Sequence, residues 1–193
     1  MKKSTIFLIG AIVVLVIWCI SAYNNLVQKD EKVTAAWGNV ETQYQRRADL
    51  IPNLVEVVKG YAKHEQGTLT AVIEARSKAT SITIDPSNIT PEELAKYQEA
   101  QSSVSSALGK LLAVAEAYPD LKAESRFADL QAQLEGTENR IAESRRVFNE
   151  TAKDFNMELR SFPNNILGGI FGLRTRAYFE SEYGANKAPK VEF

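Results

Sequence analysis

The stretch that most constrains this chain lies near its start, where twenty-five consecutive residues carry no charge. Residues 4–28 contain no Asp, Glu, Lys or Arg, and residues 5–23 are almost wholly apolar. About nineteen helical residues rise roughly 28 Å, close to the roughly 30 Å hydrocarbon core of a bilayer. Trp18 and Tyr23 stand near the far end, where aromatic side chains favour the interface. The sequence therefore predicts a membrane-spanning helix.

A cleaved signal peptide is the competing interpretation, because Lys2 and Lys3 precede the apolar run. The run is longer than a typical signal core of roughly 7 to 15 residues, and no clear small-x-small cleavage site follows it. Trp18 also precedes Cys19, where a lipid-modification site needs a small residue. We therefore expect an uncleaved anchor over residues 1–25. Lys29 and Lys32 follow the span beside Asp30 and Glu31. Against them, Lys2, Lys3 and the amino terminus favour an N-terminus in the cytoplasm and a body outside it.

Counts of a few residue types exclude several functions. The chain has 23 Lys and Arg against 24 Asp and Glu, a formal charge of -1, and so lacks the basic excess of a nucleic-acid binder. One His and one Cys cannot build a cysteine or histidine metal site or an internal disulfide. We expect no nucleic-acid partner, no metal, no cofactor and no catalytic residue.

Beyond the span, apolar residues recur at helical spacing, without the sustained alternation of a strand. Val33, Trp37, Val40 and Tyr44, for example, are spaced by 4, 3 and 4 residues. Four such segments can bury one another's apolar stripes. The predicted fold is all-α, with an N-terminal transmembrane helix and an antiparallel four-helix bundle of long helices, packed like a coiled coil, over residues 26–162. A C-terminal tail covers 163–193.

The boundary between the first two segments can be placed in two ways. Pro52 suits the first turn of a helix, and a sharp turn over residues 46–52 would give helices of matched length. One helix merely kinked at Pro52 would instead run from about residue 26 to 79, roughly 80 Å, and give three helices. We expect the turn, and so four helices.

The third segment has a clear start. Thr90 is the expected N-cap, Pro91 the first helical residue and Glu93 the partner in a capping box. Residues 81–90 are the expected main loop, because they hold Pro, Ser and Asn. Pro119 starts the fourth and longest segment.

The tail contains apolar residues that suit a membrane surface, with two arginines after them. In an up-down-up-down bundle, the fourth helix would return this segment to the bilayer. The alternative is a tail folded back onto the core of the bundle. The candidate membrane-surface residues are Ile166, Leu167, Ile170, Phe171 and Leu173.

A few polar residues deserve a functional interpretation beside the structural one. His64 with Glu65 is the only candidate general base, although neighbours on a helix point about 100° apart, so a solvent-facing histidine is expected. Glu65 and Arg76 fall on an apolar stripe and need partners from another helix. The candidate partners on the fourth segment are Glu138, Arg140 and Arg145.

The expected turn over residues 46–52 would present a polar group at the membrane-distal end. Its members, Arg46, Arg47, Asp49 and Asn53, are either capping and ion-pairing residues or a docking site for a partner. Extra apolar positions widen some helix faces, which favours self-association; they include Val57, Val72 with Ile73, and Leu111 with Leu112.

Several motifs together resemble the LemA family over nearly the whole chain. They include RRADLIPNLVEVVKGYAKHE at 46–65, LLAVAEAYPDLKA at 111–123, TENRIAESRRVFN at 137–149 and the closing SFPNN, FGL, YFE and PKVEF pieces. The resemblance implies a bacterial envelope protein with an N-terminal membrane anchor, a four-helix body and no established enzymatic activity.

Two functions follow as hypotheses. One is a self-associating scaffold or structural protein in the inner (cytoplasmic) membrane, with the lipid bilayer and copies of itself as partners. The other is an adapter or sensor that regulates a neighbouring membrane protein such as a protease, by analogy with the family. An enzyme is not expected, because no nucleophile-base pair, metal set or phosphate loop is present.

Overall fold

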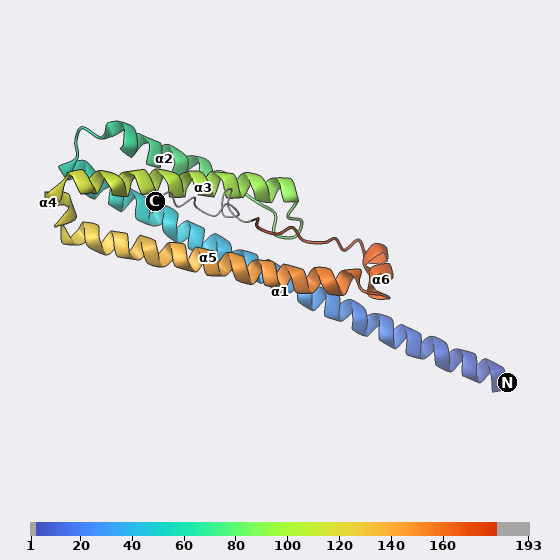
Figure 1. Ribbon diagram of the computed structural model, residues 1–193. Helices are drawn as coiled ribbons and strands as arrows, with labels where there is room; N and C mark the ends of the chain where they lie inside the picture. Colours follow the sequence, from blue (N-terminus) through green and yellow to red (C-terminus); the bar gives the residue numbers. More distant parts are fainter. Residues whose placement is uncertain (1–2, 181–193) are drawn as a thin grey trace, which may run out of the picture.

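The computed structural model describes residues 3–180, and every regular element in that range is a helix. The expectation of an all-α chain that begins with a long apolar helix is confirmed. The longest elements, α1, α2, α3 and α5, lie side by side, and shorter elements connect them (Figure 1).

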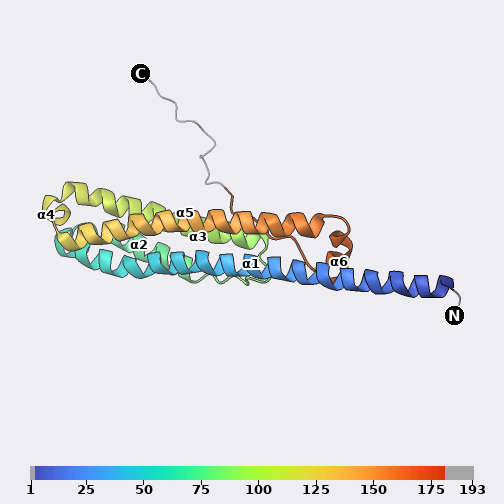
Figure 2. The ribbon, with the colours of Figure 1, turned by 90° about the horizontal axis from the view of Figure 1, so that it is seen from below.

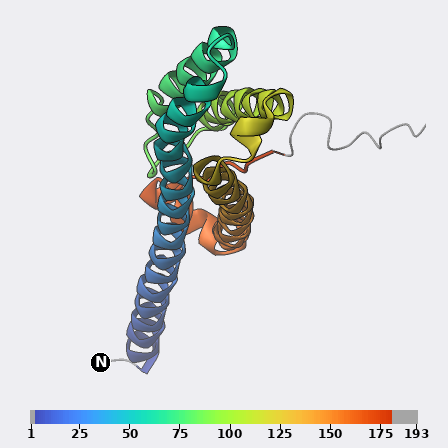
Figure 3. The ribbon, with the colours of Figure 1, turned by 90° about the vertical axis from the view of Figure 1, so that its left-hand side faces the viewer.

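Helix α1, Lys3–Tyr61, joins the apolar span to the body without a break. Its 59 residues correspond to about 88 Å. The apolar part, which is long enough to cross a bilayer, begins at Ile6 and none of it is buried. Figures 2 and 3 show this part extending beyond the other helices. The body is therefore attached to the span through continuous helix.

The expected turn over residues 46–52 is wrong. Pro52 lies inside α1, and the chain reverses only after Tyr61, near residues 62–65. The single kinked helix is also wrong in its extent, because α2, Gln66–Thr80, is a separate element. The residues expected at a membrane-distal turn therefore lie along α1, within the body.

The start of α3, Pro91–Val114, confirms the predicted capping box. The Glu93 backbone N–H donates to Thr90 Oγ1 at 3.2 Å, and the Thr90 backbone N–H donates to Glu93 Oε2 at 3.1 Å. The predicted loop separates α2 from α3, and its Ile84 and Ile89 are buried. A local sequence signal was sufficient here because both partners lie within one turn of helix.

The 3-10 helix η1, Ala115–Ala117, and the short helix α4, Pro119–Lys122, lead into α5, Ser125–Arg160. Helices α1 and α5 run in opposite directions where they contact each other. Lys29 pairs with Glu158 at 3.2 Å, and Tyr61, at the other end of α1, donates to Glu124, just before α5, at 2.9 Å. This pairing places the end of α5 beside the part of α1 that follows the span.

The buried side chains form two clusters along the body. The cluster at the membrane-distal end is mainly aliphatic, with Leu54, Val58, Val72 and Leu111 among its members, and it includes one aromatic side chain, Phe127. The cluster nearer the span is aromatic and is centred on Trp37, whose ring lies 5.4 Å from Tyr97, 5.6 Å from Phe148 and 5.9 Å from Phe179. Trp37 thus brings α1, α3, α5 and the segment after α6 together.

Helix α6, Asn164–Phe171, folds against the end of α5. A Cβ at Gly168 would clash with Leu159 Cδ1, so a larger residue there would force the Leu159 side chain to move. Gly172 then ends the helix with a positive φ of 70°. The chain therefore turns sharply and runs back along the body.

The returning segment, residues 173–180, is held by its backbone. Asn156 accepts from the Arg176 N–H and donates to its carbonyl, both at 2.8 Å, and Asn149 pairs with Phe179 in the same way at 2.9 and 3.0 Å. Gln98 on α3 repeats the pattern with Glu180 at 3.3 and 2.9 Å. These three side-chain amides therefore satisfy backbone N–H and C=O groups of Arg176, Phe179 and Glu180, in a segment without regular secondary structure.

Candidate functional site

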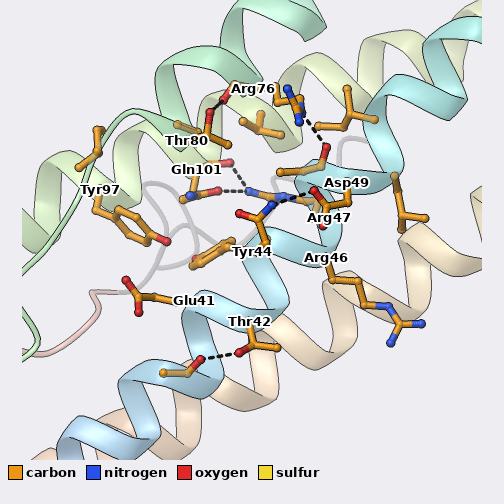
Figure 4. A pocket seen from close by; sticks show the side chains of 18 of the residues that line it. Glu41, Thr42, Tyr44, Arg46, Arg47, Asp49, Arg76, Thr80, Tyr97 and Gln101 are labelled. Atoms are coloured by element: carbon orange, nitrogen blue, oxygen red, sulfur yellow. Dashed lines mark hydrogen bonds between the residues drawn. The ribbon is translucent and has the colours of Figure 1, made fainter.

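A polar cleft of about 840 Å³ lies between α1, α2 and α3 (Figure 4). It brings together all the residues that were candidates for partner docking, namely Arg46, Arg47, Asp49 and Asn53. Arg46, Asp49 and Asn53 are exposed, whereas Arg47 is buried. The four residues line the same cleft but differ in exposure, so their roles differ.

Arg47 is the internal polar centre of the cleft, and only 2% of it is exposed. Its Nη2 donates to the side chain and the carbonyl of Gln101 on α3, at 2.6 and 3.0 Å. Its Nη1 donates to Ser105 at 2.7 Å and to Glu138 on α5 at 2.9 Å. A buried guanidinium is costly unless all of its donors are engaged. The network therefore fixes how α1, α3 and α5 meet.

A second arginine explains why α1 continues through Pro52. Proline has no N–H, so the carbonyl of Ala48, four residues earlier, loses its donor within the helix. Arg76 on α2 supplies a replacement, since its Nε donates to that carbonyl at 2.7 Å. The interaction ties α2 to α1 and satisfies the carbonyl that Pro52 leaves without a partner.

Aromatic rings line one side of the cleft. Tyr44 and Tyr97 meet edge to face at 5.4 Å, and the Arg47 guanidinium lies 5.1 Å from the centre of the Tyr44 ring. Burial, followed by the nearby Tyr44, raises the pKa of Tyr97 far above its usual range. Tyr97 therefore stays a neutral phenol at any physiological pH.

The cleft offers charged and hydrogen-bonding side chains. Asp49 accepts from Gln45 at 2.7 Å, and Arg46 points away from the Arg47 network (Figure 4). Across residues 3–180, no group of three or more His, Cys, Asp or Glu side chains could hold a metal ion. The exposed Arg46, Asp49 and Asn53 present charged and hydrogen-bonding groups along this cleft.

The other polar candidates are placed separately. His64 is exposed beyond the end of α1, and the half-buried Glu65 accepts from Tyr118 at 3.4 Å. Among the expected partners on α5, Glu138 pairs with Arg47 and not with Arg76, and Arg140 bonds Gln43 and Thr137. Arg145 donates to the carbonyl of Glu180. The expected pairing of Arg76 with an α5 carboxylate is therefore wrong.

The apolar positions expected to support self-association are mostly internal. Val57, Val72 and Leu111 are buried in the membrane-distal cluster and Leu112 is half-buried, whereas Ile73 is 50% exposed. The candidate membrane-surface residues divide in the same way. Leu167 is buried and Leu173 half-buried, and the exposed members are Ile166, Ile170 and Phe171.

Sequence reasoning missed the role of Arg176, which is buried beside the start of the body. It pairs with Asp30 on α1 at 2.6 Å and donates to the carbonyls of Pro86 and Ser87 in the loop before α3. The only available signal was an arginine within an apolar tail. The partners lie far away in the chain, so the sequence could not identify them.

These features define a class: a helical body joined without interruption to an apolar helix long enough to cross a bilayer. The family model described as the LemA family matches residues 36–193, so the chain belongs to the LemA family. The predicted resemblance is confirmed.

Relatives of known name support this assignment. Magnetosome protein MamQ 2 of Paramagnetospirillum magneticum is 27% identical over 83% of this chain, and Magnetosome protein MamQ of Magnetospirillum gryphiswaldense is 26% identical over the same share. The chain spans 65% of the length of each. Protein LemA of Metamycoplasma hominis is 26% identical over 82% of this chain and 68% of its own length.

Proposed function

We propose that this chain is a membrane-anchored, non-enzymatic structural protein of the bacterial envelope. The observation that carries the proposal is α1, in which an exposed apolar stretch passes directly into the core of the body. A span that leads into a packed helix holds its body at a defined orientation, which suits a structural role. The names of the three relatives describe no reaction.

Within this proposal, α1 from residue 26 onward, α2, α3 and α5 act as one antiparallel four-helix bundle. The Arg47 and Arg76 interactions support it because they connect these four helices. The anchor lies in the cytoplasmic membrane with the body outside the cytoplasm, an orientation supported by Lys2 and Lys3 before the span.

The test is the behaviour of the native protein in its own membrane. Membranes are washed with alkaline carbonate and floated on a density gradient, and the N-terminus of the mature protein is sequenced. The proposal expects the protein to stay with lipid and to retain residues 1–25. Release into the soluble fraction, or a mature chain that begins after Tyr23, would refute it.

A scaffold role adds self-association in the plane of the membrane. The fixed orientation imposed by α1 supports it, because copies held alike can meet repeatedly through the same face. Crosslinking in native membranes, followed by mass measurement of the extracted complex, is the test. The scaffold role predicts homo-oligomers at native expression levels, and a monomer at every crosslinker concentration would contradict it.

The alternative is an adapter for a neighbouring membrane protein, and the polar cleft favours it. The exposed side chains at the cleft include Arg46, Asp49 and Asn53. We expect that each can be substituted without disturbing Arg47. A photo-crosslinking residue at position 53 should capture one defined membrane protein, whereas the same residue at the exposed Glu135 on α5 should not. Identical products from both positions would contradict the adapter role.

A further inference from the structure

The short helix α6 exposes an apolar face that the body does not use. Phe162, just before it, is 82% exposed, and Ile166, Ile170 and Phe171 are 54%, 70% and 52% exposed. The opposite side of α6 packs inward through Leu167 and Gly168. The helix is thus amphipathic, and four large apolar side chains remain in contact with the surroundings.

The position of α6 indicates what those surroundings are. The ring of Phe171 lies 4.4 Å from the ring of Tyr23 on α1. Tyr23 ends the apolar stretch of α1, and the views agree that α6 sits beside α1 where it leaves the other helices (Figures 1 and 2). The exposed face therefore lies at the level where the chain leaves the hydrocarbon core.

The charges around α6 suit the same surroundings. Arg160 ends α5 and Arg174 follows α6, and both are exposed. Lysine and arginine side chains near a bilayer are attracted to anionic headgroups, and apolar side chains beside them enter the acyl boundary. The neighbouring acid Glu158 is neutralised by Lys29 and is half-buried.

We propose that the exposed face of α6, formed by Phe162, Ile166, Ile170 and Phe171, inserts into the headgroup region of the same bilayer that α1 crosses. The body then contacts the membrane at two points, which fixes its tilt and its rotation about α1. Residues 173–180 strengthen this arrangement, because the amide pairs of Asn149 and Asn156 hold the chain that follows α6 against α5. The inference rests on the proposed anchoring by α1.

The experiment places an environment-sensitive fluorophore at position 170 of the full chain. Cys19 is replaced by Ser, and Ile170→Cys is compared with Ile73→Cys, an isoleucine of α2 that is 50% exposed and far from the span. Each labelled protein is placed as a single copy in nanodiscs of phosphatidylethanolamine and phosphatidylglycerol. Quenching by brominated lipid and by iodide in the buffer is measured for both.

The expected result is a blue-shifted label at position 170, quenched by brominated lipid and severalfold less accessible to iodide than the label at position 73. A label at 170 that matches position 73 overturns the proposal. So does a label shielded from iodide but insensitive to brominated lipid, because a protein segment then covers the face. Shielding that appears only with two copies per disc also overturns it, in favour of a dimer contact.

A second variant separates insertion from folding and from anchoring. Ile170→Asp should leave the melting temperature unchanged, since the side chain is exposed, while a label at position 166 loses its lipid quenching. Unchanged quenching at position 166 overturns the proposal. If the labelled protein floats with lipid but the label on α6 is exposed to water, the proposed insertion of α6 is refuted and the proposed anchoring by α1 is retained. If the protein does not float with lipid, the proposed anchoring by α1 is refuted.

Discussion

The hydrogen bond from Arg76 to the Ala48 carbonyl gives the sharpest test of how α1 passes through Pro52. Replacing Arg76 by Ala leaves the Ala48 carbonyl without a donor. The lost hydrogen bond comes from a charged guanidinium, and such a bond is worth about 1.5 to 3 kcal/mol. Pro52→Ala restores an N–H to that carbonyl and removes a proline, which costs about 3 kcal/mol inside a helix. The loss of unfolding free energy caused by Arg76→Ala should therefore be smaller in the Pro52→Ala background than in the wild type, by about 1 to 2 kcal/mol.

The assay is urea unfolding of the full chain in a mild detergent, followed by circular dichroism for the wild type, both single variants and the double variant. Lys78→Ala on the exposed side of α2 is the matched control and should change the free energy of unfolding by less than about 0.5 kcal/mol in either background. Additive effects of Arg76→Ala and Pro52→Ala would refute the reasoning, because the arginine would then not serve the carbonyl that the proline leaves open.

Three further predictions concern the body. Arg47→Ala should lower the stability of the body by about 3 kcal/mol or more, because Glu138 and Gln101 lose their donor. Arg46→Ala is the control, because Arg46 is exposed, and it should change the stability by less than about 0.5 kcal/mol. Equal effects of the two substitutions in thermal unfolding would contradict the prediction. Asn156→Ala should speed limited proteolysis near residue 176, and an unchanged cleavage rate would contradict the amide pairing. Hydrogen bonds from Thr90, first its side chain and then its backbone, hold the pKa of Glu93 below its usual value. The contribution of ionised Glu93 to the stability of the body is therefore present above about pH 4.5 and is lost as the pH falls through the lowered pKa. NMR titration should give a pKa of Glu93 below its usual value. A measured pKa at the usual value would contradict the capping box.

Local signals in the sequence predicted the elements whose partners lie close by in the chain. The Thr90 cap needs only Glu93, and helical spacing places Val33, Trp37 and Val40 on one buried face. Arg47 stands three residues after Tyr44, so the continuation of this spacing was a signal of its buried position, although we expected the residue in a polar turn. Its role had no such signal, because Gln101 and Glu138 come from other helices.

The main errors have one physical cause, which is compensation by distant residues. Pro52 predicted a turn because proline removes a hydrogen bond, and the donor that replaces it belongs to Arg76, 28 residues beyond Ala48, whose carbonyl it serves. The tail offered two alternatives, and the structure divides it: residues 173–180 pack on the body, while α6 lies near the span with an exposed apolar face. The part of the predicted tail over 181–193 lies outside the described residues.

The central claim is that one uninterrupted helix joins the membrane span to the body. Hydrogen-deuterium exchange of the intact protein in a bilayer tests it most directly, by following the backbone amides of residues 20–32. The account predicts slow exchange across this whole range, because every amide there donates within α1. Rapid exchange at residues 22–28, between protected segments on either side, would show a flexible linker and contradict the account.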